Sequence, residues 1–207
     1  MYRMTPHDTA LLLWQLALGF SLSATCGLRA FLPLFAASAA AHFGQVTLGP
    51  SFAWMGSTPA LIIFGSAVVF EVLADKVPAL DHALDAAGVF VKPVAATLLA
   101  ASFFTSMDPV LASVLGLVTG GAVATTVHVV KAKTRLASSV FTLGTGNPFL
   151  SLAEDVLAVC GVILSIVLPI VAAFVIATLI ALVAFLLIRR YSRPVVPVLT
   201  HRSGLAT

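Results

Sequence analysis

The hydrophobic positions of this 207-residue chain fall into long blocks that are separated by short polar segments. Blocks of about 20 apolar residues have the length at which an α-helix crosses a lipid bilayer. The sequence contains such blocks at residues 9–26, 58–76, 89–106 and 110–130, and a longer one at residues 149–190 that would hold two spans joined near Pro169. The pattern therefore predicts an all-α fold, a polytopic transmembrane helical bundle of about six spans.

Two further pieces are too short to cross a bilayer. Residues 29–43 form an alanine-rich apolar piece, for which we expect a half-helix, a re-entrant segment or a bent continuation of the first span. Residues 79–87 lie between Pro78 and Gly88 and predict a short amphipathic helix. The bundle is thus expected to contain breaks as well as complete spans.

The composition agrees with a membrane protein. Hydrophobic residues make up 60% of the chain, charged residues only 9%, and the mean hydropathy is +1.10, whereas soluble domains carry about 25% charged residues. We predict one integral membrane domain over residues 1–193 and a short cytoplasmic tail over residues 194–207. The net charge of +3 is small and its basic residues sit at span ends, which indicates membrane topology and no nucleic-acid partner.

The basic residues also predict the orientation of the chain. If residues 29–43 do not cross the membrane, the cytoplasmic side holds both termini and the basic residues Arg3, Lys76, the 131–135 cluster and Arg189 to Arg193. If that segment does cross, the amino terminus moves outside and Arg3 opposes the rule. The oligomeric state stays open, and a homo-oligomer is compatible with the sequence.

Most of the acidic residues form three groups at helical spacing. Glu71 and Asp75 are four residues apart, as are Asp81 and Asp85, while Glu154 and Asp155 follow Ser151 by three and four. Such spacings place side chains on one face of a helix. A basic face has the same kind of spacing at His128, Lys131 and Arg135.

These faces define the candidate site. A charge near the bilayer centre costs about 2.5–3.5 kcal/mol on insertion scales, so such charges are paired, hydrated or functional. One interpretation is a network in which the acids neutralise Lys76, Lys92, Lys131 and Arg135 and staple the helices. The other is a polar centre for a small solute or ion, whose binding residues would be Glu71, Asp75, Lys76, Asp81, Asp85, His128, Lys131, Arg135, Asn147, Ser151, Glu154 and Asp155.

The segment before the fifth span has glycines at 144 and 146, then Asn147 and Pro148. Asn147 is a good helix cap and Pro148 suits a first helical turn, so the amides of a helix N-terminus would point into the polar centre. The segment would then be a gate or an anion dock. The alternative is simply a well-capped start of the span.

No enzyme motif accompanies these residues. The chain lacks a phosphate-binding glycine loop, a zinc-protease motif, a serine elbow and a cofactor fingerprint, and we predict no cofactor. Asp81, His82 and Asp85 could hold a divalent metal, but one short cluster does not define a metal centre. Transport is therefore favoured over two alternatives, an enzyme acting on a lipid headgroup or phosphate and a structural or assembly subunit of a membrane complex.

Four ordered motifs resemble a family of bacterial membrane proteins catalogued as domain of unknown function 4126. They are GLRAFLPL at residues 27–34, the acidic segment 71–85 with the following VKP, the basic segment 128–135 and the segment 144–155. The family pattern has an arginine where this chain has Lys92, which keeps the charge. The resemblance implies a multi-pass protein of the bacterial inner membrane and supplies no chemistry.

Overall fold

The computed structural model describes residues 6–75, 77–143 and 145–191, with the side chains at 6–8, 78–79, 81–82, 187–188 and 190–191 outside the description. Every regular element in these ranges is helical. In chain order they are α1 (Pro6–Cys26), α2 (Phe31–His42), the 3₁₀ segment η1 (Pro50–Gly56), α3 (Thr58–Ala74), α4 (Pro78–Ser102), α5 (Pro109–Gly116), the π-helical segment η2 (Leu117–Gly121), α6 (Ala122–Thr142), α7 (Asn147–Val167) and α8 (Pro169–Tyr191).

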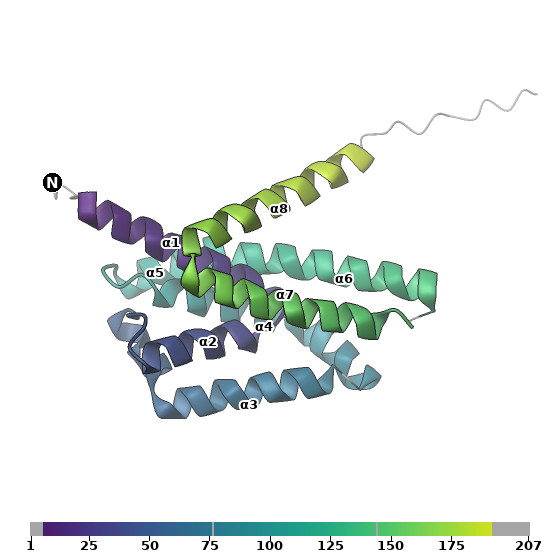
Figure 1. The fold of residues 1–207 in the computed structure, drawn as a ribbon, viewed down its shortest axis with the longest axis horizontal. Helices are drawn as coiled ribbons and strands as arrows, with labels where there is room; N and C mark the ends of the chain where they lie inside the picture. The colour runs from purple at the N-terminus through teal and green to yellow at the C-terminus, as the bar shows by residue number, and fades with distance from the viewer. Residues whose placement is uncertain (1–5, 76, 144, 192–207) are drawn as a thin grey trace, which may run out of the picture.

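The helices have the lengths and compositions of membrane spans. Five of them are long and apolar enough to cross a bilayer, and η1 with α3, which meet at a bend of 64°, can form a sixth. Figure 1 shows these helices running roughly along the long axis of one elongated bundle. The predicted all-α bundle of about six spans is confirmed in the described part of the chain.

The predicted half-helix is also confirmed. α2 has 12 residues, which corresponds to about 18 Å of helix and is shorter than the roughly 30 Å hydrocarbon core. α1 ends inside the bundle, and α2 turns back from that point toward the end at which α1 begins (Figure 1). The four residues between the two helices, 27–30, thus form a non-helical tip within the protein.

Two boundaries differ from the prediction. Residues 79–87 are not a separate helix, because they form the first turns of α4, which continues through Gly88 and Pro93. A glycine inside a helix costs about 1 kcal/mol and does not by itself break it. The fourth predicted span, 110–130, continues as α6 to Thr142, so its basic residues lie within a helix and not at its end.

Glycines allow the close approach of η2 to α4. A Cβ on Gly120 would lie 2.6 Å from Ala96 O and 2.7 Å from Ser23 Oγ. Ser23 in turn donates a hydrogen bond of 2.9 Å to Ala96 O. π-Helical turns are rare, and those that occur are frequently found near functional sites. Here the π-helical segment η2 contacts both α1 and α4.

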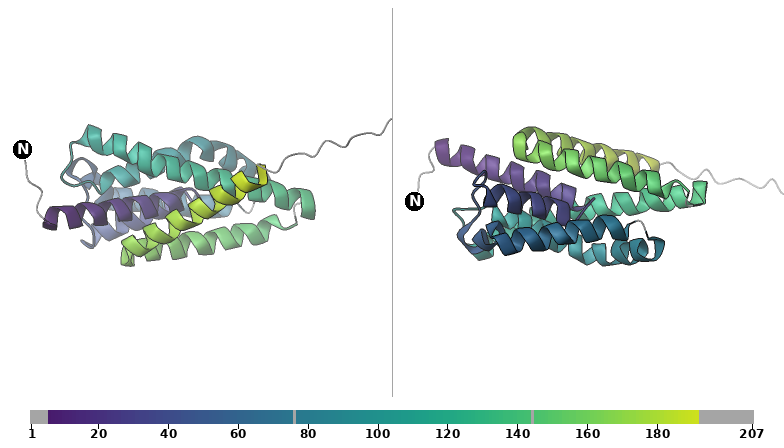
Figure 2. Two further views of the ribbon diagram at one scale, coloured as in Figure 1. Left: turned by 90° about the horizontal axis from the view of Figure 1, so that it is seen from above. Right: turned by 60° about the horizontal axis from the view of Figure 1, so that its bottom comes forward.

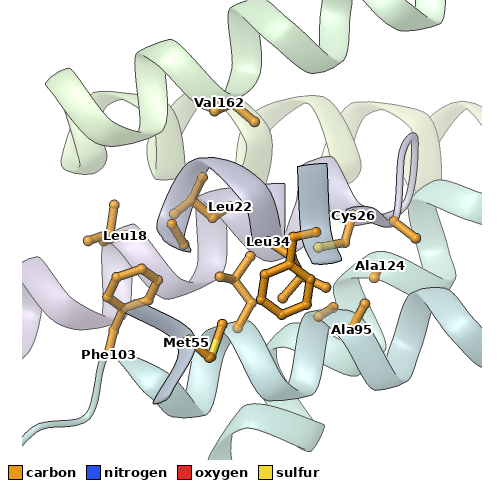
Figure 3. Packing of buried hydrophobic residues seen from close by; sticks show 14 of the residues in the cluster. Leu18, Leu22, Cys26, Leu34, Met55, Ala95, Phe103, Ala124 and Val162 are labelled. Carbon is orange, nitrogen blue, oxygen red and sulfur yellow. The ribbon is translucent and has the colours of Figure 1, made fainter. Parts of the chain in front are cut away.

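The core lies around the second half of α1. Leu18, Leu22 and Cys26 are fully buried and pack with residues of α2, α4, α6 and α7 (Figure 3). α7 and α8 lie together on one side of the bundle and α3 on another (Figure 2). Large apolar side chains such as Phe90 and Phe174 are 77% and 74% exposed, which is the arrangement expected of a protein whose surface faces lipid.

Candidate functional site

The tip between α1 and α2 is the centre of the charged cluster. Arg29, in this tip, has a side chain that is only 2% exposed, and its Nη1 lies 2.5 Å from Asp75 Oδ2. Its Nη2 forms an ion pair with Asp155 and donates to Ser151 Oγ at 3.4 Å. Ser151 Oγ donates to Asp75 Oδ2 at 3.3 Å. One arginine thus joins the tip to the end of α3 and to α7.

The backbone N–H and C=O groups of the tip form hydrogen bonds with side chains on two other helices. Glu71, on α3, accepts hydrogen bonds from Ala30 N at 2.8 Å and from Phe31 N at 3.2 Å, and so provides the cap that α2 lacks from its own N-cap residue. Lys131, on α6, donates to Leu28 O at 3.2 Å. Non-helical backbone at membrane depth needs such partners, and here charged side chains supply them.

A second group of ion pairs joins α6 to α7 and α4. Arg135 forms a bidentate ion pair with Glu154, in which Nη2 donates to Oε2 at 2.8 Å and Nε donates to Oε1 at 3.2 Å. Lys131 Nζ lies 3.1 Å from Glu154 Oε2. Arg135 also reaches Asp85 Oδ2 at 3.4 Å and Asp75 Oδ2 at 3.7 Å. Bidentate arginine–carboxylate pairs of this kind are both strong and geometrically specific.

Lys92 and His128 form a separate contact. Lys92, on α4, is 4% exposed and His128, on α6, is 5% exposed, and Lys92 Nζ lies 3.0 Å from His128 Nδ1. Gly88, one turn before Lys92, makes this packing possible, because a Cβ there would lie 3.2 Å from both Lys92 Cε and His128 Cε1. The lysine therefore lies across the face of its own helix against the histidine.

A cavity of about 470 Å³ lies beside this cluster. Its walls come from the tip, α3, α4 and α6, and it has both charged and apolar parts. The charged residues in its wall are Arg29, Glu71, Asp75, Asp85, Lys92 and Lys131. A second cavity of about 370 Å³ lies between α6, α7 and α8; its lining is largely apolar but includes Lys131 and Glu154. Lys131 thus lines both cavities.

Most of the predicted site residues meet in one place. The described side chains that take part in this cluster of ion pairs and hydrogen bonds are Glu71, Asp75, Asp85, His128, Lys131, Arg135, Ser151, Glu154 and Asp155. Residue Lys76 and the side chain of Asp81 lie outside the described part of the chain, as do Gly144, Arg3 and the predicted tail 194–207.

Asn147 differs from the prediction that it caps α7. It lies inside the helix, where Gly146 is the N-cap residue and no side chain caps it. Its Nδ2 donates to Ser139 Oγ on α6 at 2.9 Å. Pro148 does lie in the first turn, as predicted. Asn147 does not line the larger cavity, and its role as a gate or anion dock stays a prediction.

The candidate set omitted Arg29 and Lys92, although both line the cavity. Arg29 was visible in the sequence as a single arginine between two apolar stretches, inside the motif GLRAFLPL. Lys92 was visible as a lysine near the start of an apolar block. An isolated charge in an apolar context is a signal in its own right, because its burial requires a partner from elsewhere in the chain.

The acidic side chains of the cluster lie beside cationic side chains. Within the described residues, no group of three His, Cys, Asp or Glu side chains is placed to hold a metal ion. Acids alternate with cations, since Asp75 lies between Arg29 and Arg135, and Glu154 lies between Lys131 and Arg135. The carboxylates of Asp75, Asp85 and Glu154 thus meet at the guanidinium of Arg135, whereas the alternative of a metal-dependent lipid enzyme would require them to converge on a metal ion.

Comparison with known proteins gives a family and no activity. A family model described as a domain of unknown function, DUF4126, matches residues 16–190. No curated protein and no solved structure matches the chain.

Proposed function

The chain belongs to the membrane-protein family described as domain of unknown function 4126, and from that premise we propose that it moves a small solute or ion through its charged centre. The observation that carries the proposal is the convergence of charged side chains from the tip, α3, α4, α6 and α7 beside a cavity of about 470 Å³. Cavities of about 300–1,000 Å³ hold small molecules.

The broken helices support the same proposal. Transporters commonly bind their solutes where discontinuous helices end near the middle of the membrane. Here α2 begins inside the bundle, its first amides bind Glu71, and Arg29 precedes it in the cavity wall. The ends of α1 and α2 are thus built into the same wall that would receive a solute.

The ion pair of Lys131 with Glu154 is suited to control passage between the two cavities. Lys131 lines both of them, and Glu154 lines the one between α6, α7 and α8. A change in the position of Lys131 would alter the walls of both cavities. A purely structural network, by contrast, predicts paired charges with no cavity beside them.

The orientation follows from the ends of the bundle. α1 begins and α8 ends at opposite ends of the long axis (Figure 1). The end of the bundle at which α8 ends carries the exposed Arg189 and would face the cytoplasm by the positive-inside rule, in which case the start of α1 would lie outside. This favours the alternative orientation over one with both termini in the cytoplasm, and the membrane in question would be the bacterial inner membrane.

A flux assay in proteoliposomes tests the function. Sodium, potassium, protons, chloride and lactate are offered in turn to vesicles with wild-type protein and to protein-free vesicles. We expect one of these to move faster with protein, and Glu71→Gln and Glu154→Gln to slow it at least tenfold. Asp108→Asn is the matched control, because Asp108 is exposed and caps α5 away from the cavity.

Two results would remove the proposal. One is wild-type flux no faster than that of protein-free vesicles. The other is unchanged flux in both cavity variants, with correct folding shown by gel filtration. An equal loss in Asp108→Asn would likewise assign the effect to general damage of the fold and not to the charged centre.

A further inference from the structure

Lys92 is a buried cation in the cavity wall without a carboxylate partner in the described part of the chain. Its ammonium group contacts His128 Nδ1, and no carboxylate oxygen of a described residue lies within ion-pair distance of it. A protonated lysine has three N–H donors, and one imidazole nitrogen accepts only one of them. The remaining donors need an acceptor, because buried unpaired charge is costly.

Arg29 has a second N–H donor without a described hydrogen-bond partner. Its two terminal nitrogens bind Asp75, Asp155 and Ser151, but its Nε–H is buried and has no hydrogen-bond partner among the described residues. Arg29 and Lys92 both line the cavity of about 470 Å³. Two cationic side chains in one wall therefore have N–H groups that no described residue satisfies.

Each carboxylate in the same wall has at least one partner. Glu71 accepts two backbone N–H groups, Asp75 contacts Arg29, and Asp85 contacts Arg135. The groups in the cavity wall that have no described partner are thus N–H donors, which need an acceptor and not another cation. This distinguishes it from a cation-binding site, in which carboxylate oxygens would be the groups left without partners.

We propose that the cavity binds the carboxylate group of a small, singly charged organic acid, with Lys92 as its donor and the guanidinium of Arg29 as a second positive charge in the wall. The rest of the wall is apolar at Ala67, Phe70 and Val91, which suits the organic part of such a solute and not a fully hydrated inorganic ion. Glu71 and Asp85 in the same wall would repel a second negative charge. The inference names the solute class of the transport proposed above and rests on that proposal.

Binding is tested without a membrane. Purified protein in detergent micelles is titrated by calorimetry with acetate, butyrate and benzoate, and with the neutral benzamide and the cationic benzylamine as analogues of benzoate. We expect at least one carboxylate to bind, benzoate to bind at least tenfold more tightly than benzamide and benzylamine, and inorganic phosphate to bind more weakly than the best carboxylate.

The variants separate Lys92 from general charge effects. Lys92→Gln should weaken carboxylate binding at least tenfold, whereas Lys133→Gln, the same change at an exposed lysine on α6, should leave it unchanged. If Lys92→Gln does not fold, wild-type protein is reductively methylated with and without benzoate. Protection of Lys92 but not of Lys133, read by mass spectrometry, is then the expected result.

Several results would overturn the inference: no binding by any of the three carboxylates, equal binding of benzamide, preference for benzylamine or phosphate, or full binding in Lys92→Gln. If carboxylate binding depends on Lys92 but no solute moves in proteoliposomes, the binding site is supported and the proposed transport is contradicted. If a cation moves at a rate that does not depend on Lys92, the proposed transport is supported and the proposal that the cavity binds a carboxylate is contradicted.

Discussion

Arg29 joins the tip between α1 and α2 to α3 and α7, so its replacement tests whether the charge network stabilises the fold. Arg29→Gln keeps a polar side chain but leaves Asp75 and Asp155 without their main cation. Asp75 has a side chain that is 5% exposed and that of Asp155 is 23% exposed. Asp75 is therefore the group that would remain as a buried and poorly compensated charge.

The expected loss follows from that burial. Removal of one partner of a buried pair costs about 3–5 kcal/mol, which raises the unfolding equilibrium constant roughly 100- to 4,000-fold. Asp155→Asn should cost only about 1 kcal/mol, because Asp155 is partly exposed and Arg29 keeps Asp75. The double variant Arg29→Gln with Asp75→Asn should be about 0.5–3 kcal/mol more stable than the sum of its single changes, because both partners are then neutral.

The assay is reversible unfolding in mixed micelles, followed by circular dichroism as the denaturing detergent SDS is increased. Arg189→Gln, the same change at an exposed arginine near the end of α8, should lie within about 0.5 kcal/mol of wild type. The reasoning fails if Arg29→Gln costs less than about 1 kcal/mol or no more than Asp155→Asn. It also fails if the changes at Arg29 and Asp75 are additive.

The remaining predictions concern packing and orientation. Gly120→Ala should lower the free energy of unfolding by about 1–3 kcal/mol, because its Cβ would lie 2.6 Å from Ala96 O; a midpoint equal to that of wild type in the same assay would contradict this. Single cysteines at Gln45, in the turn after α2, and at Thr145, between α6 and α7, should face opposite sides of the membrane (Figure 1). An impermeant maleimide should label them in vesicles of opposite orientation, and labelling of both from the same side would refute the arrangement.

The helices were predictable because bilayer thickness imposes a length on apolar blocks. α1, α3, α7 and α8 follow directly from those blocks, and Pro169 marks the start of α8 as expected. The boundaries expected at Gly88 and Val130 are wrong, because a glycine or a run of basic residues does not by itself end a helix. Gly88 makes room for the Lys92 side chain inside a continuous helix, and the helix that carries Val130 continues because its basic face is buried against neighbours.

The grouping of acids and bases into faces was predictable, but their partners were not. Helical spacing put Glu71 with Asp75 and Lys131 with Arg135, and these pairs do share helix ends or faces in the structure. Which acid meets which cation depends on how distant helices pack. Arg29 lies 46 residues from Asp75 and 126 from Asp155 in the numbering, and no local pattern carries that information.

The pattern of pairing differs between the two sides of the cluster. A network that only held the helices together would satisfy its strongest donors, because each unsatisfied buried donor or charge lowers stability. Here Arg135 and Lys131 do bind carboxylates, whereas Lys92 binds only a histidine and Arg29 Nε binds nothing described. Both exceptions belong to residues that line the same cavity. Arg135 and Lys131 thus join α6 to α7 through Glu154, and the donors that lack a described partner belong to residues in the wall of the larger cavity.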